Sequence, residues 1–549
     1  MKERYKKDLS KYEGLRYWNK KTLTEYIREW ADKYGDRTAV IADDDELTYS
    51  EVDSLSDERA FGLRKLGLKK GDTAAIQLPN SAEYVITLFA LYKLGVKPVL
   101  VLPAHREAEL ASIMETAAPK AYIIPVKYMG YEYLPLARKL KSAHSCLEYI
   151  IVDGDITDGD DSVIQIKDVT AESGELPELD PYDTLHYLLS GGSTGVPKLI
   201  ARTHSDYMYL CKLCCDRCEL TSDDVYLVAL PCEHNFPTGD PGFLGIMDVG
   251  GTAVFCGHIS PDEVLDMITE YEVTVTALVP TMVSMCIDML EIDDDFDISS
   301  LRILQVGGSV FDDSAAERAI NAFSDTVIMQ VFGTSEGLII TTLLSDSRET
   351  IKKYQGKALP DQFIGEECEA TEIRIVDSED NDVADGEYGE VLCKGPYIID
   401  EYYGLGDADL SSFTADGFYR TGDKAMRTPD GYYKFVGRIK EQINRAGEKI
   451  MPAELEEHLC MYERVQDAAV IGVPDPEMGN KIYAFIVSED NNEVTMEEVF
   501  DHLTKKGVAR YKFPDRCITL DALPLTAVGK KDGKKLLEIA GNEDRTNAD

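Results

Sequence analysis

The clearest chemical signal in the sequence is the loop at residues 190–198. Its sequence, SGGSTGVPK, combines three glycines with three hydroxyl side chains and ends on Lys198. Backbone N–H groups of such a loop can close around phosphate oxygens, while the hydroxyls add donors and the lysine adds a positive charge. The spacing differs from the Walker A pattern G-x-x-x-x-G-K-[ST]. The loop therefore predicts a phosphate-binding site of another kind.

Two alternatives apply to this loop. Residues 191–195 also match G-x-S-x-G, the nucleophile elbow of serine hydrolases, in which Ser193 would be the nucleophile. An elbow must lead directly from a strand into a helix, whereas here Pro197, Lys198 and the strand-like residues 199–201 follow. A serine hydrolase is therefore disfavoured. A glycine turn with a purely structural role is the second alternative.

Strand-like and helix-like segments alternate around this loop. Residues 73–78, 98–103 and 121–126 have the apolar character of strands, and residues 82–95 and 105–117 have the periodicity of helices. The same alternation recurs between residues 225 and 308. This βαβ order predicts parallel sheets with helices on both faces.

The pattern changes after residue 365. Short strands separated by glycine-containing turns predict a β-rich subdomain at about 365–438, and a compact α+β segment follows at 439–549, with the last nine residues expected to be frayed. We therefore expect an α/β protein with a large N-terminal domain, residues 1–438, containing two βαβ-type sheets and the β-rich subdomain. A small mobile lid domain, residues 439–549, would close over it and leave the active site in the crevice between them.

Composition narrows the classes of function. The 549 residues carry a formal net charge of −43, and 44% are hydrophobic, which is sufficient for a large core. So acidic a surface repels phosphate backbones and anionic lipids, so neither nucleic-acid binding nor membrane adhesion is expected. The N-terminus is charged and lacks the apolar stretch of a signal peptide, so we expect a cytoplasmic location.

Four of the twelve cysteines form a cluster, Cys211, Cys214, Cys215 and Cys218. Their spacing of i, i+3, i+4 and i+7 places them on one stripe of a helix. A zinc or iron–sulfur site is the alternative, but a continuous helix cannot wrap around a metal ion. The spacing therefore favours core packing.

Five motifs in order along the chain carry a resemblance to a known family. The sequence resembles the adenylate-forming superfamily, which includes acyl-CoA synthetases, nonribosomal-peptide adenylation domains and firefly luciferase. The matching segments are SGGSTGVPK (190–198), VFGTSEG (331–337), FYRTGD (418–423), GRIKEQINRAGEKI (437–450) and PLTAVGK (524–530). With LPCEHNFP (230–237), they are most similar to the free-standing aryl-acid ligases of siderophore assembly, the (2,3-dihydroxybenzoyl)adenylate synthases.

The resemblance implies ATP and Mg²⁺ as cofactors, with Lys530 as the mobile lysine that stabilises charge at the reacting carboxylate and α-phosphate. Glu336 would coordinate Mg²⁺, and Asp423 and Arg438 would contact the ribose. Phe332 replaces the usual tyrosine at the adenine face, and Ser335 the usual threonine. The implied nucleotide-binding residues are Ser190, Gly191, Gly192, Ser193, Thr194, Gly195, Lys198, Gly307, Gly308, Val331, Phe332, Gly333, Ser335, Asp423 and Arg438.

The same resemblance implies an acyl pocket formed by His234, Asn235, Asp240 and Ile339. Asn235 resembles the residue that binds the ortho-hydroxyl of a 2-hydroxybenzoate, and His234 would line the pocket or the thiol tunnel. Asp240 departs from the pattern, because dihydroxybenzoate ligases usually carry serine and salicylate ligases cysteine. A buried carboxylate requires a donor partner, which favours 2,3-dihydroxybenzoate, then another aryl acid with a 3-donor. Alternatively, Asp240 points outward.

Two further positions are implied in thiol transfer. Lys440 occupies the hinge position at which the small domain would rotate, and Gly447 would line the tunnel for the phosphopantetheine arm of a carrier protein. An aryl-CoA ligase, which delivers to coenzyme A instead, matches the same motifs. A binding module without catalysis is disfavoured because the apparent catalytic set is complete.

Overall fold

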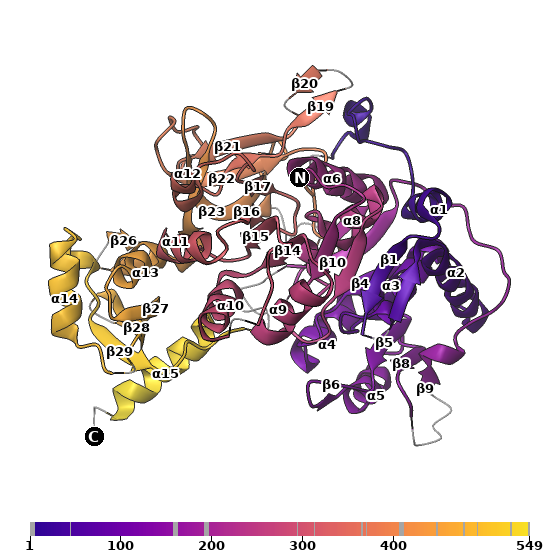
Figure 1. The fold of residues 1–549 in the computed structure, drawn as a ribbon, viewed down its shortest axis with the longest axis horizontal. Coiled ribbons are helices and arrows are strands. Elements are labelled where there is room, and N and C mark those ends of the chain that lie inside the picture. The colour runs from indigo at the N-terminus through magenta and orange to yellow at the C-terminus, as the bar shows by residue number, and fades with distance from the viewer. Residues whose placement is uncertain are drawn as a thin grey trace.

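The computed structural model describes residues 6–43, 45–156, 163–190, 197–293, 295–311, 313–363, 366–368, 370–405, 411–445, 448–475, 478–490, 492–526 and 530–546. Two large sheets with flanking helices form most of the molecule (Figure 1). Among the described residues, no helix is long and apolar enough to cross a membrane.

The larger sheet has nine strands. Its central strands are parallel and its antiparallel strands lie at the two edges. In spatial order the strands are β18 (Lys357–Ala358), β17 (Ile339–Thr341), β16 (Val327–Gly333), β15 (Ile303–Gly307), β14 (Val275–Leu278), β12 (Val225–Val228), β13 (Thr252–Phe255), β1 (Thr38–Ala42) and β2 (Asp45–Thr48). β14 and β15 are buried along their whole length, as expected for parallel strands covered on both faces.

The second sheet has seven strands and is also mainly parallel. In spatial order they are β11 (Leu199–Thr203), β10 (Thr184–Leu189), β4 (Lys97–Leu100), β3 (Thr73–Ile76), β5 (Ala121–Pro125), β8 (Tyr149–Asp153) and β9 (Val163–Gln165). β10 ends at Leu189, and the next element of the described chain is the antiparallel edge strand β11, which begins at Leu199. A nucleophile elbow would require a helix at this point, so the serine-hydrolase alternative is wrong.

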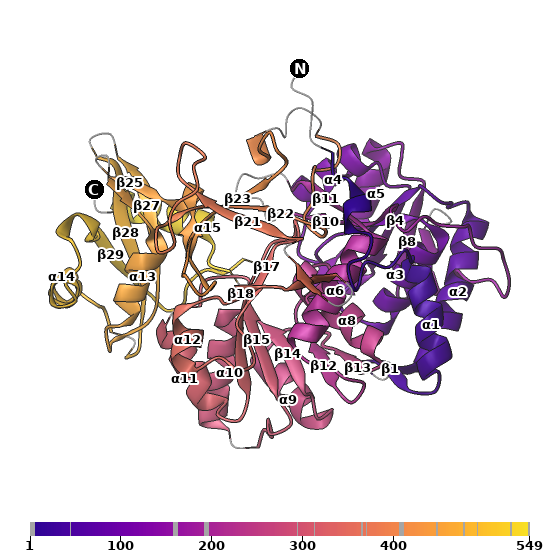
Figure 2. The same cartoon turned by 90° about the horizontal axis from the view of Figure 1, so that it is seen from above.

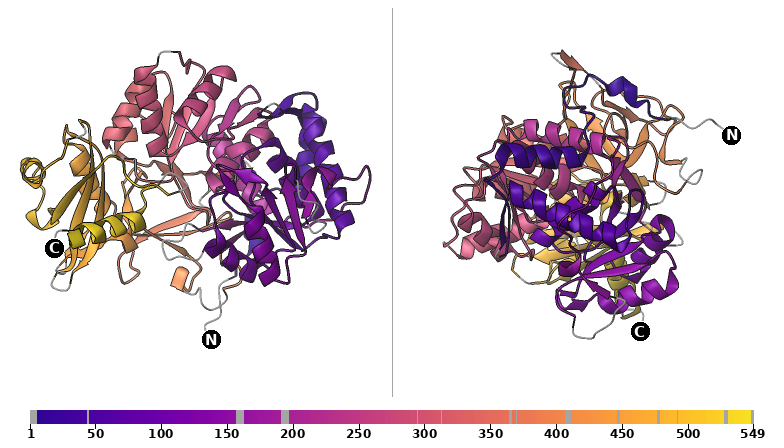
Figure 3. Two further views of the ribbon diagram at one scale, coloured as in Figure 1. Left: turned by 90° about the horizontal axis from the view of Figure 1, so that it is seen from below. Right: turned by 90° about the vertical axis from the view of Figure 1, so that its right-hand side faces the viewer.

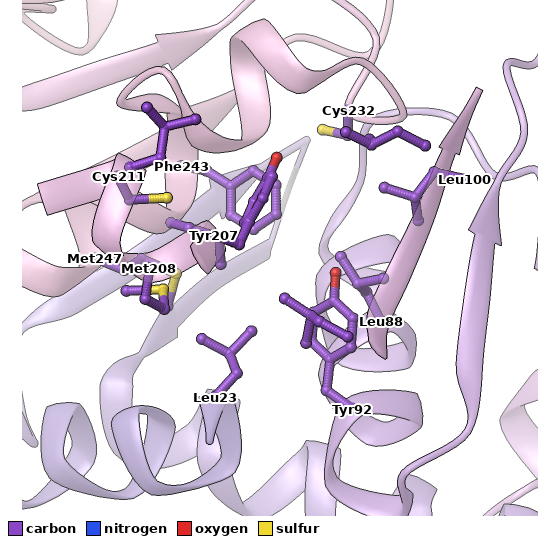
Figure 4. Packing of buried hydrophobic residues seen from close by; sticks show 14 of the residues in the cluster. Leu23, Leu88, Tyr92, Leu100, Tyr207, Met208, Cys211, Cys232, Phe243 and Met247 are labelled. Carbon is purple, nitrogen blue, oxygen red and sulfur yellow. The ribbon is translucent and has the colours of Figure 1, made fainter. Parts of the chain in front are cut away.

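The largest apolar cluster joins helices of both sheets. Helix α3 (Ala82–Leu94) begins at the cap of Ser81, ends at Gly95 with φ 68°, and is buried on nearly all sides. Its side chains face α6 (His204–Arg217) and α8 (Gly242–Val249), as Figure 4 shows for Leu88 and Tyr92 opposite Tyr207 and Phe243. This packing fixes the two sheets relative to each other.

The cysteine stripe belongs to this core. Cys211, Cys214 and Cys215 lie on α6 and Cys218 at its C-cap, and all four are buried. Burial raises the pKa of each thiol, which keeps it neutral, whereas metal ligands are thiolates. Among the described residues no group of three or more metal-ligating side chains is gathered. These buried surroundings agree with the packing role that the helical spacing of the four cysteines predicts.

A four-stranded antiparallel sheet follows the large sheets, formed by β21 (Glu372–Val376), β22 (Gly389–Lys394), β23 (Tyr419–Arg427) and β24 (Tyr433–Arg438). The remaining chain forms its own small sheet, β27 (Val465–Asp475), β28 (Gly479–Ser488) and β29 (Arg516–Leu520), with helices α13 (Pro452–Cys460), α14 (Met496–Lys505) and α15 (Gly533–Thr546). These elements lie at the end of the molecule opposite α1 (Leu23–Tyr34) and α2 (Tyr49–Leu66) (Figures 1 and 2).

The predicted fold class, an α/β protein with two large sheets and a small C-terminal α+β part, is confirmed. Residues 541–549 were expected to be frayed, but α15 continues to Thr546 because Leu536 and Ala540 pack on the small sheet and anchor the helix. The C-terminal elements have apolar clusters of their own and lie beside the β21–β24 sheet (Figure 3). The domain division at Arg438 remains a prediction.

Candidate active site

The C-terminal part of the chain delivers Lys530 to the end of strand β15. Gly308 follows this strand with φ +85°, and a Cβ built there would lie 3.8 Å from Lys530 Cε. The lysine side chain is exposed to solvent, but neighbouring groups partly desolvate its ammonium. This desolvation lowers the pKa of Lys530, and the charge of Arg438 acts in the same direction. Residues 307–308 and 530 are therefore brought together, although more than 200 positions separate them.

Asp423 and Arg438 form an ion pair beside this lysine. They are opposite each other on β23 and β24, with 3.4 Å between Arg438 Nε and Asp423 Oδ1. Burial raises the pKa of Asp423 to about 6, although Arg438 and Lys530 oppose this shift. Asp423 Oδ2 is buried and has no hydrogen-bond partner among the described residues. A carboxylate with one free oxygen can accept hydrogen bonds from ribose hydroxyls.

The ends of the glycine-rich loop meet as a β-hairpin. The Ser190 N–H donates to the carbonyl of Lys198 at 2.9 Å, and the Lys198 N–H donates to Ser190 Oγ at 3.0 Å. Lys198 Nζ lies 4.2 Å from the centre of the Tyr402 ring and donates to Ser412 Oγ. The predicted phosphate-binding residues Gly191, Gly192, Ser193, Thr194 and Gly195 lie outside the described residues.

Glu336 lies in the turn between β16 and β17. Its Oε1 accepts a hydrogen bond of 2.6 Å from Tyr402 OH, and the side chain is largely buried. A single carboxylate does not make a complete metal cage, but Mg²⁺ commonly binds one or two carboxylates together with substrate phosphates. Glu336 near Lys198 and Asp423 fits that arrangement. The carbonyl of Ser335 accepts a hydrogen bond from Arg202 Nη1 at 3.4 Å.

The adenine-side residues lie on β16. Val331 is buried, and its carbonyl would be 2.5 Å from a Cβ on Gly307, so these strands approach closely. Phe332 stacks on Phe435 with 3.5 Å between ring centroids and an angle of 13°. One face of Phe332 is therefore already covered, and an adenine ring would have to use the other face.

The predicted acyl-pocket residues gather around short helix α7 (Asn235–Gly239). His234 caps its start and Asp240 its end. Ile339 Cδ1 and Asp240 Oδ2 lie 2.8 Å and 3.9 Å from the position of a Cβ on Gly333. Burial, with Lys530 and His105, lowers the pKa of His234 to about 3, so its imidazole is neutral. Asp240 points inward, and the alternative that it faces solvent is wrong.

Asp240 and Asn235 form a buried pair. Asn235 Nδ2 donates to Asp240 Oδ2 at 2.6 Å, while Asp240 Oδ1 and Asn235 Oδ1 are both buried and find no partner in the part of the chain that the structure describes. Burial raises the pKa of Asp240 to about 8, although the charge of Arg202 and the bond from Asn235 lower it. The pocket therefore holds unsatisfied polar atoms that a polar ligand group could pair.

The structure describes one of the two residues predicted to act in thiol transfer. Lys440 is exposed in a short 3₁₀ turn, Ile439–Glu441, directly after β24, and Gly447 lies outside the described residues. Three residues of the site were not identified from the sequence. Tyr402 donates to Glu336, the charge of Arg202 acts on Asp240, and Gln305 donates to the Asp240 carbonyl. None belongs to a motif with a chemical signature, so spatial proximity alone reveals them.

Comparisons with known proteins agree with this geometry. The family model "AMP-binding enzyme" matches residues 27–403, and "AMP-binding enzyme C-terminal domain" matches residues 454–530. The solved structure of MbtA from Mycobacterium smegmatis has a TM-score of 0.73 and 38% identity, covering 96% of this chain and 97% of that one. The fold is thus that of an adenylate-forming enzyme.

The chain belongs to the AMP-binding enzyme family. It is 41% identical to the 2,3-dihydroxybenzoate-AMP ligase of Bacillus subtilis, covering 95% of this chain and 94% of the relative. It is 37% identical to the salicyl-AMP ligase / salicyl-S-ArCP synthetase of Mycobacterium tuberculosis, covering 96% and 93%. The predicted resemblance to adenylate-forming enzymes is confirmed.

The raised pKa of Asp240 predicts how stability depends on pH. The folded protein keeps a proton on Asp240 that the unfolded chain releases near pH 4, so this group makes stability fall between about pH 4 and pH 8. Asp240→Asn preserves the shape and cannot ionise. We expect the free energy of unfolding of the variant, relative to that of wild type, to rise by on the order of 3 kcal/mol when the pH is raised from 5 to 8. Unfolding curves at both pH values measure this.

The exposed Asp223→Asn provides the matched control, since its side chain is 92% accessible. Its stability difference from wild type is expected to be the same at both pH values. A parallel pH dependence of wild type and Asp240→Asn would contradict the raised pKa.

Proposed function

We propose that the protein activates an aryl carboxylic acid with ATP and transfers the acyl group to a thiol. In the first step a carboxylate oxygen of the acid attacks the α-phosphorus of ATP, and the bond to pyrophosphate breaks. In the second step the phosphopantetheine thiol of a carrier protein attacks the acyl carbon, losing its proton, and AMP leaves. The setting would be siderophore or related nonribosomal biosynthesis, as the resemblance to the free-standing aryl-acid ligases implies.

The observation that carries this proposal is the place of Lys530. It lies beside Gly308, and its charge acts on the Asp423–Arg438 pair and on His234, so a single cation can reach the nucleotide side and the acyl side of the cleft. Negative charge develops at the carboxylate–phosphate junction during adenylation. A preorganised cation at that point stabilises the transition state more than the separated substrates.

The other residues bind and orient the substrates. Lys198 and the glycine-rich loop would hold the phosphates of ATP, and Asp423 and Arg438 the ribose. Glu336 would hold Mg²⁺, which neutralises phosphate charge when bound. His234 remains neutral and is therefore suited to line the pocket for an acid that is already ionised. Ile339 supplies an apolar wall.

The favoured acid is 2,3-dihydroxybenzoate, because of Asp240. Its Oδ1 is buried and has no partner among the residues that the structure describes, and leaving such an atom unpaired in the complex is costly. A 3-hydroxyl can donate to the ionised carboxylate, and it can also accept from the protonated form. Salicylate presents only a hydrogen at this position. A 3-amino group, which donates well but accepts poorly, ranks next.

Lys530→Ala separates the two half-reactions. Loss of the cation is expected to reduce aryl-acid-dependent ATP–pyrophosphate exchange by about 100-fold or more. Transfer from preformed aryl-adenylate should change little, because the phosphorus–oxygen bond has already been made. Transfer is measured to carrier protein and to coenzyme A, because the aryl-CoA ligase alternative differs in acceptor alone.

Lys534→Ala is the matched control, since Lys534 is an exposed lysine of the same segment. It should retain both half-reactions. Equal loss of both half-reactions in Lys530→Ala would overturn the role of Lys530.

Asp240 determines the preference among ring substituents. We expect the wild type to use 2,3-dihydroxybenzoate with a kcat/KM at least about tenfold above that for salicylate, since one unpaired buried group costs about 1.4 kcal/mol or more. Asp240→Ser should bring the two kcat/KM values closer together, because a serine hydroxyl can find a partner whether or not the ring carries a 3-hydroxyl. Pyrophosphate exchange across a panel of substituted benzoates measures this, and a wild-type preference for salicylate would contradict it.

A further inference from the structure

A lysine close to the N-terminus is half-buried against the segment 396–400, which adjoins Glu336. The Lys7 N–H donates to Asp400 Oδ2 at 3.0 Å, a contact between residues 393 positions apart. Its ammonium group donates to two main-chain carbonyls, that of Pro396 and, at 3.0 Å, that of Ile398. Lys7 therefore clamps the segment 396–400 from three points.

The clamped segment supports Glu336 directly. The Ile399 N–H donates to the carbonyl of Glu336 at 2.9 Å. A Cβ on Gly337 would lie 1.9 Å from the Tyr397 carbonyl oxygen, so the two backbones are in close contact, and Gly337 has φ +125°. Two residues beyond the clamp, Tyr402 OH donates to the Glu336 carboxylate at 2.6 Å. The segment thus fixes both the backbone and the side chain of Glu336.

Keeping the ammonium group of Lys7 charged at this position costs free energy. Burial lowers the pKa of its ammonium to about 8, opposed by Asp206 and Asp400, while Arg202 adds to the decrease. Burying a cation is seldom the most stable solution, because an apolar side chain of similar volume avoids the desolvation cost. The ammonium does offer what an apolar residue cannot, namely several directed bonds to carbonyls of one segment.

We propose that Lys7 is a positioning residue of the active site, which orients the Glu336 carboxylate by fixing the segment 396–402 through the carbonyls of Pro396 and Ile398. The inference rests on the proposed role of Glu336 in holding Mg²⁺ with ATP. Lys7 touches neither substrate, and it acts through the backbone contacts of residues 397–399 and through Tyr402.

The test compares Lys7→Met, which keeps the length of the side chain but loses its charge and donors, with wild type. Hydrogen–deuterium exchange of the ligand-free protein is followed in peptides that cover residues 330–340 and 395–403. The Mg²⁺ dependence of ATP–pyrophosphate exchange and the thermal unfolding are measured in parallel. Lys6→Met, at the exposed neighbouring lysine, is the matched control.

We expect hydrogen–deuterium exchange in both peptides to be faster in Lys7→Met than in wild type. The apparent KM for Mg²⁺ should rise about tenfold, the size seen when a group that orients a metal ligand is removed. The kcat at saturating Mg²⁺ should change less than about twofold. Lys7→Arg, which keeps a charge and several donors, should recover most of the Mg²⁺ affinity. Lys6→Met should match wild type.

The proposal is overturned if Lys7→Met leaves hydrogen–deuterium exchange in both peptides unchanged. It is also overturned if the variant loses kcat and thermal stability while the KM for Mg²⁺ stays constant, because that result indicates a merely structural lysine. Failure of the proposed function has a different signature: wild type would then show no pyrophosphate exchange with any aryl acid. Hydrogen–deuterium exchange of the ligand-free protein in these two peptides would still decide the role of Lys7.

Discussion

Desolvation of charged groups is the constraint on which the cleft depends. Burial raises the pKa of Asp240 to about 8 and that of Asp423 to about 6, and it lowers that of His234 to about 3. The acidic groups thus lose part of their charge, while the guanidinium of Arg438, whose pKa is raised by Asp423 and Glu441, remains a cation. A cleft in a protein of net charge −43 is thereby made suitable for two anions, a carboxylate and a polyphosphate.

The fold provides this environment from distant parts of the chain. Gly308 and Glu336 follow parallel strands of the nine-stranded sheet, and Asp423 and Arg438 lie on the β-rich sheet. Lys530 comes from the last part of the chain. Its arrival beside Gly308 depends on how the C-terminal elements lie against the rest, so any motion of these elements would couple adenylation to the next step.

Much of this arrangement could be predicted from the sequence, because local patterns determine it. The βαβ alternation predicted parallel sheets, since apolar runs separated by amphipathic segments have few other solutions. The cysteine stripe of α6 was assigned to packing by its helical spacing. The inward orientation of Asp240 was one of two open alternatives, which only its surroundings on α7 and β16 could decide.

Long-range contacts could not be predicted in this way. Lys7 meets Pro396, and Tyr402 meets Glu336, through tertiary packing that no spacing along the chain encodes. The bond between Asn235 and Asp240 is local, yet it depends on burial that the composition of α7 does not reveal. The continuation of α15 to Thr546 was missed for a similar reason, because Ala540 anchors it in a distant cluster.

The most direct test of the account is mass spectrometry of the products formed from ATP, Mg²⁺ and 2,3-dihydroxybenzoate without a thiol acceptor. The account predicts one enzyme-bound 2,3-dihydroxybenzoyl-adenylate per active site and an equal amount of pyrophosphate. Formation of ADP and phosphate, or the absence of any acyl-adenylate with the whole series of aryl acids, would contradict it.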